Sequence, residues 1–134
     1  MNTGMLEHVN ITVSDPKKTA DLLTRLFDWK IRWSGKAKDD GYTYHVGTEN
    51  SYLAVYTLGT PKPYSLPTGS TLNGLNHVGV VVEDLDDTEK RIIEEGFTPN
   101  SHGDYEPGKR FYFEDNDGIE FEVISYADGS TSNG

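Results

Sequence analysis

Apolar and polar side chains alternate over residues 8–13 of this chain and then give way to a helical spacing. In the stretch "HVNITV", Val9, Ile11 and Val13 fall on one face of a strand, because successive side chains point to opposite faces. The next stretch, "PKKTADLLTRLF", repeats apolar residues at the period of an α-helix: Ala20, Leu22, Leu23, Leu26 and Phe27. Asp15 precedes it as an N-cap and Pro16 takes the first helical position, so the pattern predicts a strand followed directly by a helix.

The same pattern returns 69 residues later. "LEHVNITVSD" begins at Leu6, and "LNHVGVVVED" begins at Leu75. The second copy also leads into a helical pattern, "LDDTEKRIIEEG", which ends at Gly96, a residue typical of helix C-termini. The chain is therefore predicted to contain an internal repeat with a histidine near the start of each copy.

Three more strands are predicted after each helix. They cover residues 30–34, 42–47 and 51–58 in the first copy and residues 97–100, 109–115 and 119–126 in the second. The turn "DNDG" joins the last two as a hairpin. This order gives two βαβββ modules, 5–58 and 74–126, with a Gly-, Pro-, Ser- and Thr-rich linker, 59–73, and a flexible tail, 127–134. A module of about 60 residues is marginal alone, so both modules are expected to pack as one α+β domain.

Two histidines and a glutamate fall on strand faces that no predicted helix covers. His8 and His77 lie opposite the apolar residues of their strands, and Glu122 lies opposite Phe121 and Val123. Two imidazoles and a carboxylate that converge suit a divalent metal. A single strand histidine is more often an ordinary surface or core residue, and Glu122 alone would be an exposed acid. The equivalent positions of the two histidines favour the metal.

Composition narrows the class of protein. The formal net charge is −10, which disfavours nucleic acid and anionic membranes as partners. The chain has no cysteine, which excludes disulfides and fits a cytoplasmic protein. It shows neither a signal peptide pattern nor an apolar stretch of membrane-spanning length, so a cytoplasmic location is expected.

Residues 5–126 resemble the vicinal-oxygen-chelate superfamily, which includes glyoxalases, bleomycin- and fosfomycin-resistance proteins and extradiol ring-cleaving dioxygenases. The resemblance rests on the two L-x-H-V strands and on "FYFEDNDGIEFEV". This last stretch is similar to the terminal hairpin of the family, although Asn116 replaces the usual proline. The resemblance implies two paired βαβββ modules that form a U-shaped mixed sheet around a metal site, with the helices outside.

The resemblance also implies ligands and partners. The metal ligands of the family map onto His8, His77 and Glu122. Fe2+ or Mn2+ is favoured at such a site, with Zn2+ or Ni2+ as alternatives, since all of these ions accept imidazole and carboxylate ligands. Members of the family chelate a small substrate through adjacent oxygens and often dimerise, so a small-molecule substrate and a homodimer are expected.

Two family reactions are disfavoured by the residues present. Glyoxalase I needs a fourth ligand from the first module, but the equivalent of Glu122 there is Leu53 or Ala54, and neither can ligate a metal. Fosfomycin transferases carry a basic residue beyond the ligand glutamate, whereas "VISYADGSTSNG" contains no lysine or arginine.

The second module is closer to the extradiol dioxygenase signature. By this resemblance, Tyr112 would hydrogen-bond a substrate oxygen and His102 would act in acid–base catalysis. Arg110 is expected to fix an anionic substrate group, and Tyr56 is expected to line the substrate pocket. The segment 101–110 is predicted either to close over the site or to be a plain surface loop.

The favoured hypothesis is therefore a divalent-metal-dependent enzyme, with extradiol-type ring cleavage slightly ahead of glyoxalase-type isomerase or lyase chemistry. The main rival is a metal-free small-molecule binding protein of the bleomycin-resistance type. A purely structural role is the third alternative, and it predicts neither metal nor ligand binding.

Overall fold

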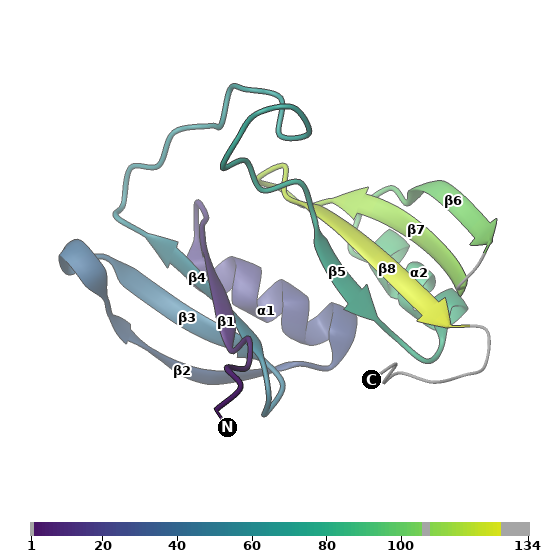
Figure 1. Ribbon diagram of the computed structural model, residues 1–134, viewed down its shortest axis with the longest axis horizontal. Coiled ribbons are helices and arrows are strands. Elements are labelled where there is room, and N and C mark those ends of the chain that lie inside the picture. Colours follow the sequence, from purple (N-terminus) through teal and green to yellow (C-terminus); the bar gives the residue numbers. More distant parts are fainter. Residues whose placement is uncertain (1, 106–107, 127–134) are drawn as a thin grey trace. The chain divides into compact units, whose positions relative to one another are not determined.

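A computed structural model describes residues 2–105 and 108–126 of the chain. The chain divides into two compact units, Met1–Lys62 and Pro63–Gly134. Each unit holds one four-stranded mixed sheet and one α-helix, drawn in purple to blue and in teal to yellow in Figure 1. The predicted α+β fold with two βαβββ modules is confirmed.

The first unit runs β1 (His8–Thr12), α1 (Pro16–Phe27), β2 (Lys30–Lys36), β3 (Tyr42–Gly47) and β4 (Tyr52–Thr57). Its sheet has the order β1-β4-β3-β2, in which β1 is parallel to β4 and the other pairs are antiparallel. A short 3₁₀ turn, Lys38–Asp40, connects β2 and β3. The predicted cap is present, since the Asp15 side chain accepts a hydrogen bond from the Lys18 N–H, at 3.1 Å.

The second unit repeats this topology with β5 (Val78–Val81), α2 (Leu85–Glu94), β6 (Asn100–Tyr105), β7 (Gly108–Glu114) and β8 (Glu120–Tyr126). Its sheet has the order β5-β8-β7-β6, with β5 parallel to β8. Gly96 follows α2 with a φ of 95°, a left-handed conformation that glycine adopts without steric cost, so the helix ends where the sequence predicts.

Each helix covers one face of its own sheet, and the core of each unit lies in between (Figure 1). In the first unit, Leu22, Leu23 and Leu26 of α1 are buried. In the second unit, Phe111, Phe113 and Phe121 are at most 1% exposed. The alternate residues of the same strands point to the face without a helix, and that face carries the candidate chemistry.

Strand β6 corrects the sequence-based assignment. The sequence predicts a strand over residues 97–100 and a loop over 101–110, whereas β6 begins at Asn100 and extends to Tyr105. Backbone pairing with β7 forms this strand, with an irregularity between Asn100 and Gly103. Most of its side chains are exposed and polar, so it has no alternating apolar pattern that would reveal it. Residues 106–107 and the predicted tail 127–134 lie outside the described residues.

In the described part of the chain, neither α-helix has the length and hydropathy needed to cross a lipid bilayer.

The turn between β7 and β8 depends on the buried carboxylate of Asp115. Its Oδ1 accepts hydrogen bonds from the backbone N–H groups of Asp117, at 2.9 Å, and Ile119, at 3.0 Å. Gly118 has a φ of 80°, which suits glycine at this point of the turn. Because Glu122 follows four residues after Gly118, this turn sets the register of the strand that carries it.

Replacing Asp115 with alanine is expected to lower the free energy of unfolding by about 1–2 kcal/mol, because two backbone donors lose their acceptor. Chemical denaturation would measure this loss. Asn116→Ala is the matched control: Asn116 is exposed in the same turn, and a change within about 0.5 kcal/mol is expected there. Equal effects of the two substitutions would contradict the role of Asp115.

Candidate functional site

The Glu122 carboxylate is the centre of a cluster on the open face of the second sheet. Its side chain is 14% exposed, although it is ionisable. Arg110 Nη1 donates a hydrogen bond to Glu122 Oε2 at 2.9 Å, and His77 Nε2 lies 3.1 Å from Glu122 Oε1. Strand pairing explains the contact with Arg110, since β7 and β8 are neighbours. A nearly buried carboxylate needs such cationic or donor partners to offset its lost hydration.

Both predicted histidine ligands are oriented in the same way by the residue that precedes them. His8 Nδ1 lies 2.9 Å from Glu7 Oε1, and His77 Nδ1 lies 2.7 Å from Asn76 Oδ1. A carboxylate only accepts hydrogen bonds, so His8 donates through Nδ1 and its Nε2 takes no part in this contact. The hydrogen bond from His8 is also the main cause that lowers the pKa of Glu7. Metal-binding histidines are commonly fixed through the second ring nitrogen in this way.

Tyr112 lies beside this pair. It faces Glu122 across the β7–β8 ladder, and its ring meets the His77 ring edge-on, with centroids 5.6 Å apart. Burial, followed by the charge of Glu122 and a hydrogen bond to it, raises the pKa of Tyr112. The phenol therefore stays protonated at neutral pH and acts as a hydrogen-bond donor.

The donor atoms of His77 and Glu122 fit a divalent metal. His77 Nε2 and Glu122 Oε1 are both atom types that ligate divalent metals, and they lie 3.1 Å apart. Two ligands about 2.1 Å from one ion lie roughly 3.0–3.4 Å apart at octahedral to tetrahedral angles. Within either unit, no three His, Asp or Glu side chains of the described residues are grouped closely enough to hold an ion.

The structure does not bring His102 to Glu122. His102 Nε2 lies 2.6 Å from Glu89 Oε2 of α2, and its ring packs near the buried ring of Phe111. It thus lies on the helix side of the sheet, whereas Tyr112 and Glu122 lie on the open side. Tyr56 belongs to the first unit, where its hydroxyl donates to the Lys38 carbonyl at 2.5 Å.

Strand register identifies the counterparts of the cluster in the first module. Gly79, two residues after His77, pairs with Glu122, and Asn10, two residues after His8, pairs with Ala54. Ala54 is therefore the equivalent of Glu122, which decides between the two candidates left open by the sequence. By the same register, His45 corresponds to Tyr112 and Thr43 to Arg110. The first module therefore has the equivalent histidine, His8, but Thr43 and Ala54 stand in place of Arg110 and Glu122.

The first module has a row of rings at this place instead. The His8 and Tyr52 rings stack at 4.9 Å, those of Tyr52 and His45 at 4.5 Å, and Trp33 lies 5.1 Å from His45. The row crosses the four strands of the sheet, and the Arg32 guanidinium covers the Tyr52 ring at 4.4 Å. Burial and the nearby His8 lower the pKa of His45, which therefore stays neutral. Sequence alternation alone does not reveal this row, because stacking depends on cross-strand register.

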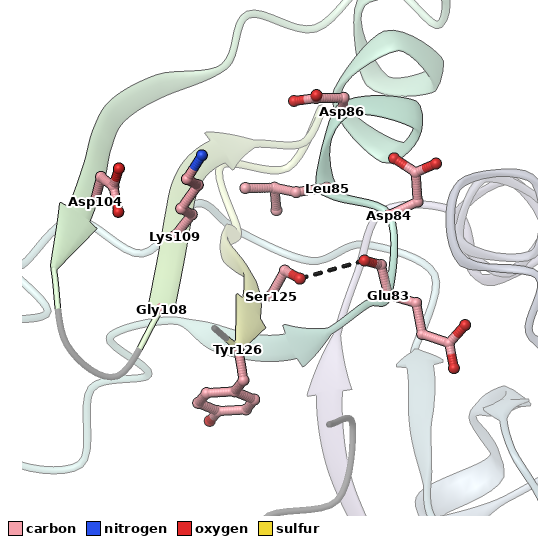
Figure 2. Close-up of a pocket in the computed structure, with 9 residues that line it drawn as sticks. All are labelled: Glu83, Asp84, Leu85, Asp86, Asp104, Gly108, Lys109, Ser125 and Tyr126. Atoms are coloured by element: carbon pink, nitrogen blue, oxygen red, sulfur yellow. Dashed lines mark hydrogen bonds between the residues drawn. The ribbon is translucent and has the colours of Figure 1, made fainter. Parts of the chain in front are cut away.

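A cavity of about 560 Å³ in the second unit lies away from the cluster (Figure 2). Figure 2 shows Glu83 and Asp84 just before α2 and Asp86 in its first turn, with Lys109 and Asp104 on the strands β7 and β6. None of the predicted metal ligands lines this cavity. Its carboxylates are exposed, and Asp84 already caps α2 by accepting from the Asp87 N–H. The Glu122 cluster is therefore a better candidate for the functional site than this cavity.

Comparisons with known proteins agree with this fold. Over about 95% of both chains, three solved structures match at 15–21% identity. A glyoxylase/bleomycin resistance protein/dioxygenase domain from Frankia sp. EAN1pec matches with a TM-score of 0.78 and 21% identity, covering 97% of this chain and 96% of that one. TnmS3, an antibiotic binding protein from Streptomyces sp. CB03234, matches with a TM-score of 0.72 and 15% identity, covering 95% and 99%. FosX, a fosfomycin resistance protein from Listeria monocytogenes, matches with a TM-score of 0.69 and 18% identity, covering 95% and 96%.

A comparison with curated protein sequences gives no match. The family model of the Glyoxalase/Bleomycin resistance protein/Dioxygenase superfamily matches residues 5–123, which is nearly the whole chain and includes both histidine strands and Glu122. The superfamily contains both enzymes and binding proteins. The resemblance expected from the sequence is confirmed, and the chain belongs to the glyoxalase/bleomycin resistance protein/dioxygenase superfamily.

Proposed function

We propose that the protein is a divalent-metal-dependent enzyme that holds a small substrate through two adjacent oxygens. The observation that carries this proposal is the pair of donor atoms, His77 Nε2 and Glu122 Oε1, which face one another at 3.1 Å. His8 is the third proposed ligand, because its Nδ1 is fixed by Glu7 as that of His77 is by Asn76. His8 comes either from the same chain or from a second copy in a homodimer.

The reaction proposed is extradiol-type ring cleavage, with Fe2+ or Mn2+ at the site. A bound metal of this kind supplies a Lewis acid and a template for two vicinal oxygens and dioxygen. Ala54 supplies no fourth ligand from the first module, which favours three-ligand chemistry over the glyoxalase I type. Isomerase or lyase chemistry with Zn2+ or Ni2+ is the alternative within this proposal.

The protein residues around the site would orient the substrate. Tyr112, kept protonated by burial and by Glu122, would donate a hydrogen bond to a substrate oxygen. Arg110 holds Oε2 of Glu122, so Oε1 stays directed at His77. His102 is bound to Glu89 on the other side of the sheet, so the proposal gives it no part in proton transfer.

A second function, metal-free binding of a small molecule, is favoured by one specific observation. The Arg110 guanidinium already supplies a positive charge to Glu122, and both side chains are almost fully buried, at 12% and 14% exposure. A cluster neutralised in this way is stable without an ion. The antibiotic binding protein TnmS3 has the same fold, which is compatible with this alternative.

The metal content of the purified protein, produced without a His-tag, distinguishes the two functions. We expect near-stoichiometric Fe2+ or Mn2+ after anaerobic reconstitution, and about a 100-fold weaker metal affinity in Glu122→Gln, since an amide is a poor ligand for these ions. Glu120→Gln is the matched control, because Glu120 lies on the same face of β8, two residues earlier. Elemental analysis and a competition titration would measure both. A wild-type protein that takes up none of the four ions would overturn the metal proposal.

Tyr112→Phe tests the proposed substrate contact. Loss of one hydrogen bond to a charged oxygen is expected to lower kcat/KM about 10–100-fold for oxygen uptake with catechols, with metal content unchanged. His102→Ala, on the other face, is expected to retain kcat within about threefold, because it lies away from Glu122. An equal loss in both variants would contradict the assignment of the open face.

A further inference from the structure

The guanidinium of Arg110 has two donors that bond to nothing in the described structure. Its Nη1 donates to Glu122, whereas Nε and Nη2 are both buried without a hydrogen-bond partner among residues 2–105 and 108–126. Buried donors of this kind are rare in folded proteins, and each needs an explanation. Only one of the three guanidinium nitrogens, Nη1, therefore hydrogen-bonds to the protein itself in the described structure.

The two free donors form one edge of the guanidinium plane. The N–H groups of Nε and Nη2 lie side by side and point the same way, which is the geometry that donates to both oxygens of a carboxylate at once. Glu122 occupies the other side of the group, where it fixes the plane and leaves this edge without an acceptor. The arrangement suits a ligand with a planar carboxylate, because the two carboxylate oxygens match the spacing of the two parallel N–H groups and make charge-assisted hydrogen bonds with them.

The ring of Tyr105 covers this guanidinium. The Arg110 Cζ lies 4.4 Å from the centre of the Tyr105 ring. Tyr105 belongs to the edge strand β6 and is 60% exposed, so its ring can swing into water with little loss of packing. The free donors are inaccessible while the ring remains in this position, which explains their burial.

Gly103 makes the covered position possible. It pairs with Arg110 in the β6–β7 ladder, and a Cβ built on it would lie 2.6 Å from the Tyr105 ring. Its φ lies outside the left-handed range, so alanine fits the backbone at this place. Space for the ring, rather than backbone freedom, is therefore the reason for a glycine here.

We infer that Arg110 is the binding site for a carboxylate of the ligand, received by Nε and Nη2 after the Tyr105 ring moves aside. The inference deepens the proposed function and rests on it for one point, that the ligand is bound on the Glu122 face. It narrows the ligand class to small organic acids, for example an aromatic carboxylate. Binding of the carboxylate needs no metal, so it can be tested apart from the metal centre.

The test is a titration of the full chain with benzoate in the presence of EDTA, followed by the Nε–H signal of Arg110 in ¹H–¹⁵N NMR spectra. Benzamide, a neutral molecule of the same shape, is the control ligand. We expect benzoate to shift the Arg110 signal saturably and benzamide to bind at least about tenfold more weakly, the ratio that one charged hydrogen bond contributes. The same titration after loading with Mn2+ or Zn2+, followed by calorimetry, shows whether the carboxylate and the metal bind independently. Failure of metal uptake alone would affect only the proposed function.

Three variants give the inference its sharpest test. Arg110→Lys keeps the charge next to Glu122 but lacks the planar pair of donors, and is expected to weaken benzoate binding about tenfold or more by fluorescence titration. Lys109→Ala removes the neighbouring exposed cation and is expected to change binding less than about twofold. Gly103→Ala displaces the Tyr105 ring without altering Arg110, and is expected to tighten binding about threefold or more, because the covered state no longer competes.

Circular dichroism and thermal unfolding would verify the fold of each variant. The inference is overturned if benzoate and benzamide bind equally, or if folded Arg110→Lys binds benzoate as the wild type does. It is also overturned if neither the wild type nor Gly103→Ala binds benzoate. Binding to Gly103→Ala alone would support it, since the glycine and the tyrosine are then what keeps the donors covered.

Discussion

Side chains along a strand point alternately to the two faces of a sheet, and this constraint governs the whole protein. One face of each sheet is committed to its helix, which buries Phe111, Phe113 and Phe121 in the second unit. The alternate residues of the same strands point to the other face and do not need to be apolar. Arg110, Tyr112 and Glu122 occupy that second set of positions. A one-residue slip of β8 would exchange the two sets, so the turn capped by Asp115 maintains both the core and the site.

The position of Glu122 on this face also has an electrostatic consequence. Glu122 is almost buried and must be neutralised, because an isolated carboxylate in such a place is strongly unfavourable. Arg110 performs this on one oxygen, and His77 faces the other oxygen. The two proposed functions differ in what His77 and Glu122 share across their 3.1 Å contact, a proton in the binding protein or a metal in the enzyme. The superfamily contains both kinds of protein, and a change of one cation is a physically small step between them.

Much of this was predictable, for reasons that particular residues make clear. The repeat of L-x-H-V, the Asp15 cap and the Gly96 stop predict two βαβββ modules, since each signal is local in sequence. The contact between Arg110 and Glu122 was not predictable in detail, because it depends on the β7–β8 register. The contact between His102 and Glu89 was not predictable either, because it depends on how α2 packs against the sheet and not on sequence spacing. Strand β6 was missed because a polar edge strand leaves no periodic trace.

The two modules have the same framework but different chemistry, and equivalent register positions show where they differ. Gly35 and Gly103 are equivalent, and each lies beneath an aromatic ring, Trp33 or Tyr105. In the first module the Trp33 ring leans on His45, whereas in the second the Tyr105 ring lies on Arg110. One glycine-and-ring arrangement therefore supports a neutral aromatic row in one module and covers a cation in the other. Because each module has its own sheet, one sheet can present rings while the other presents charge.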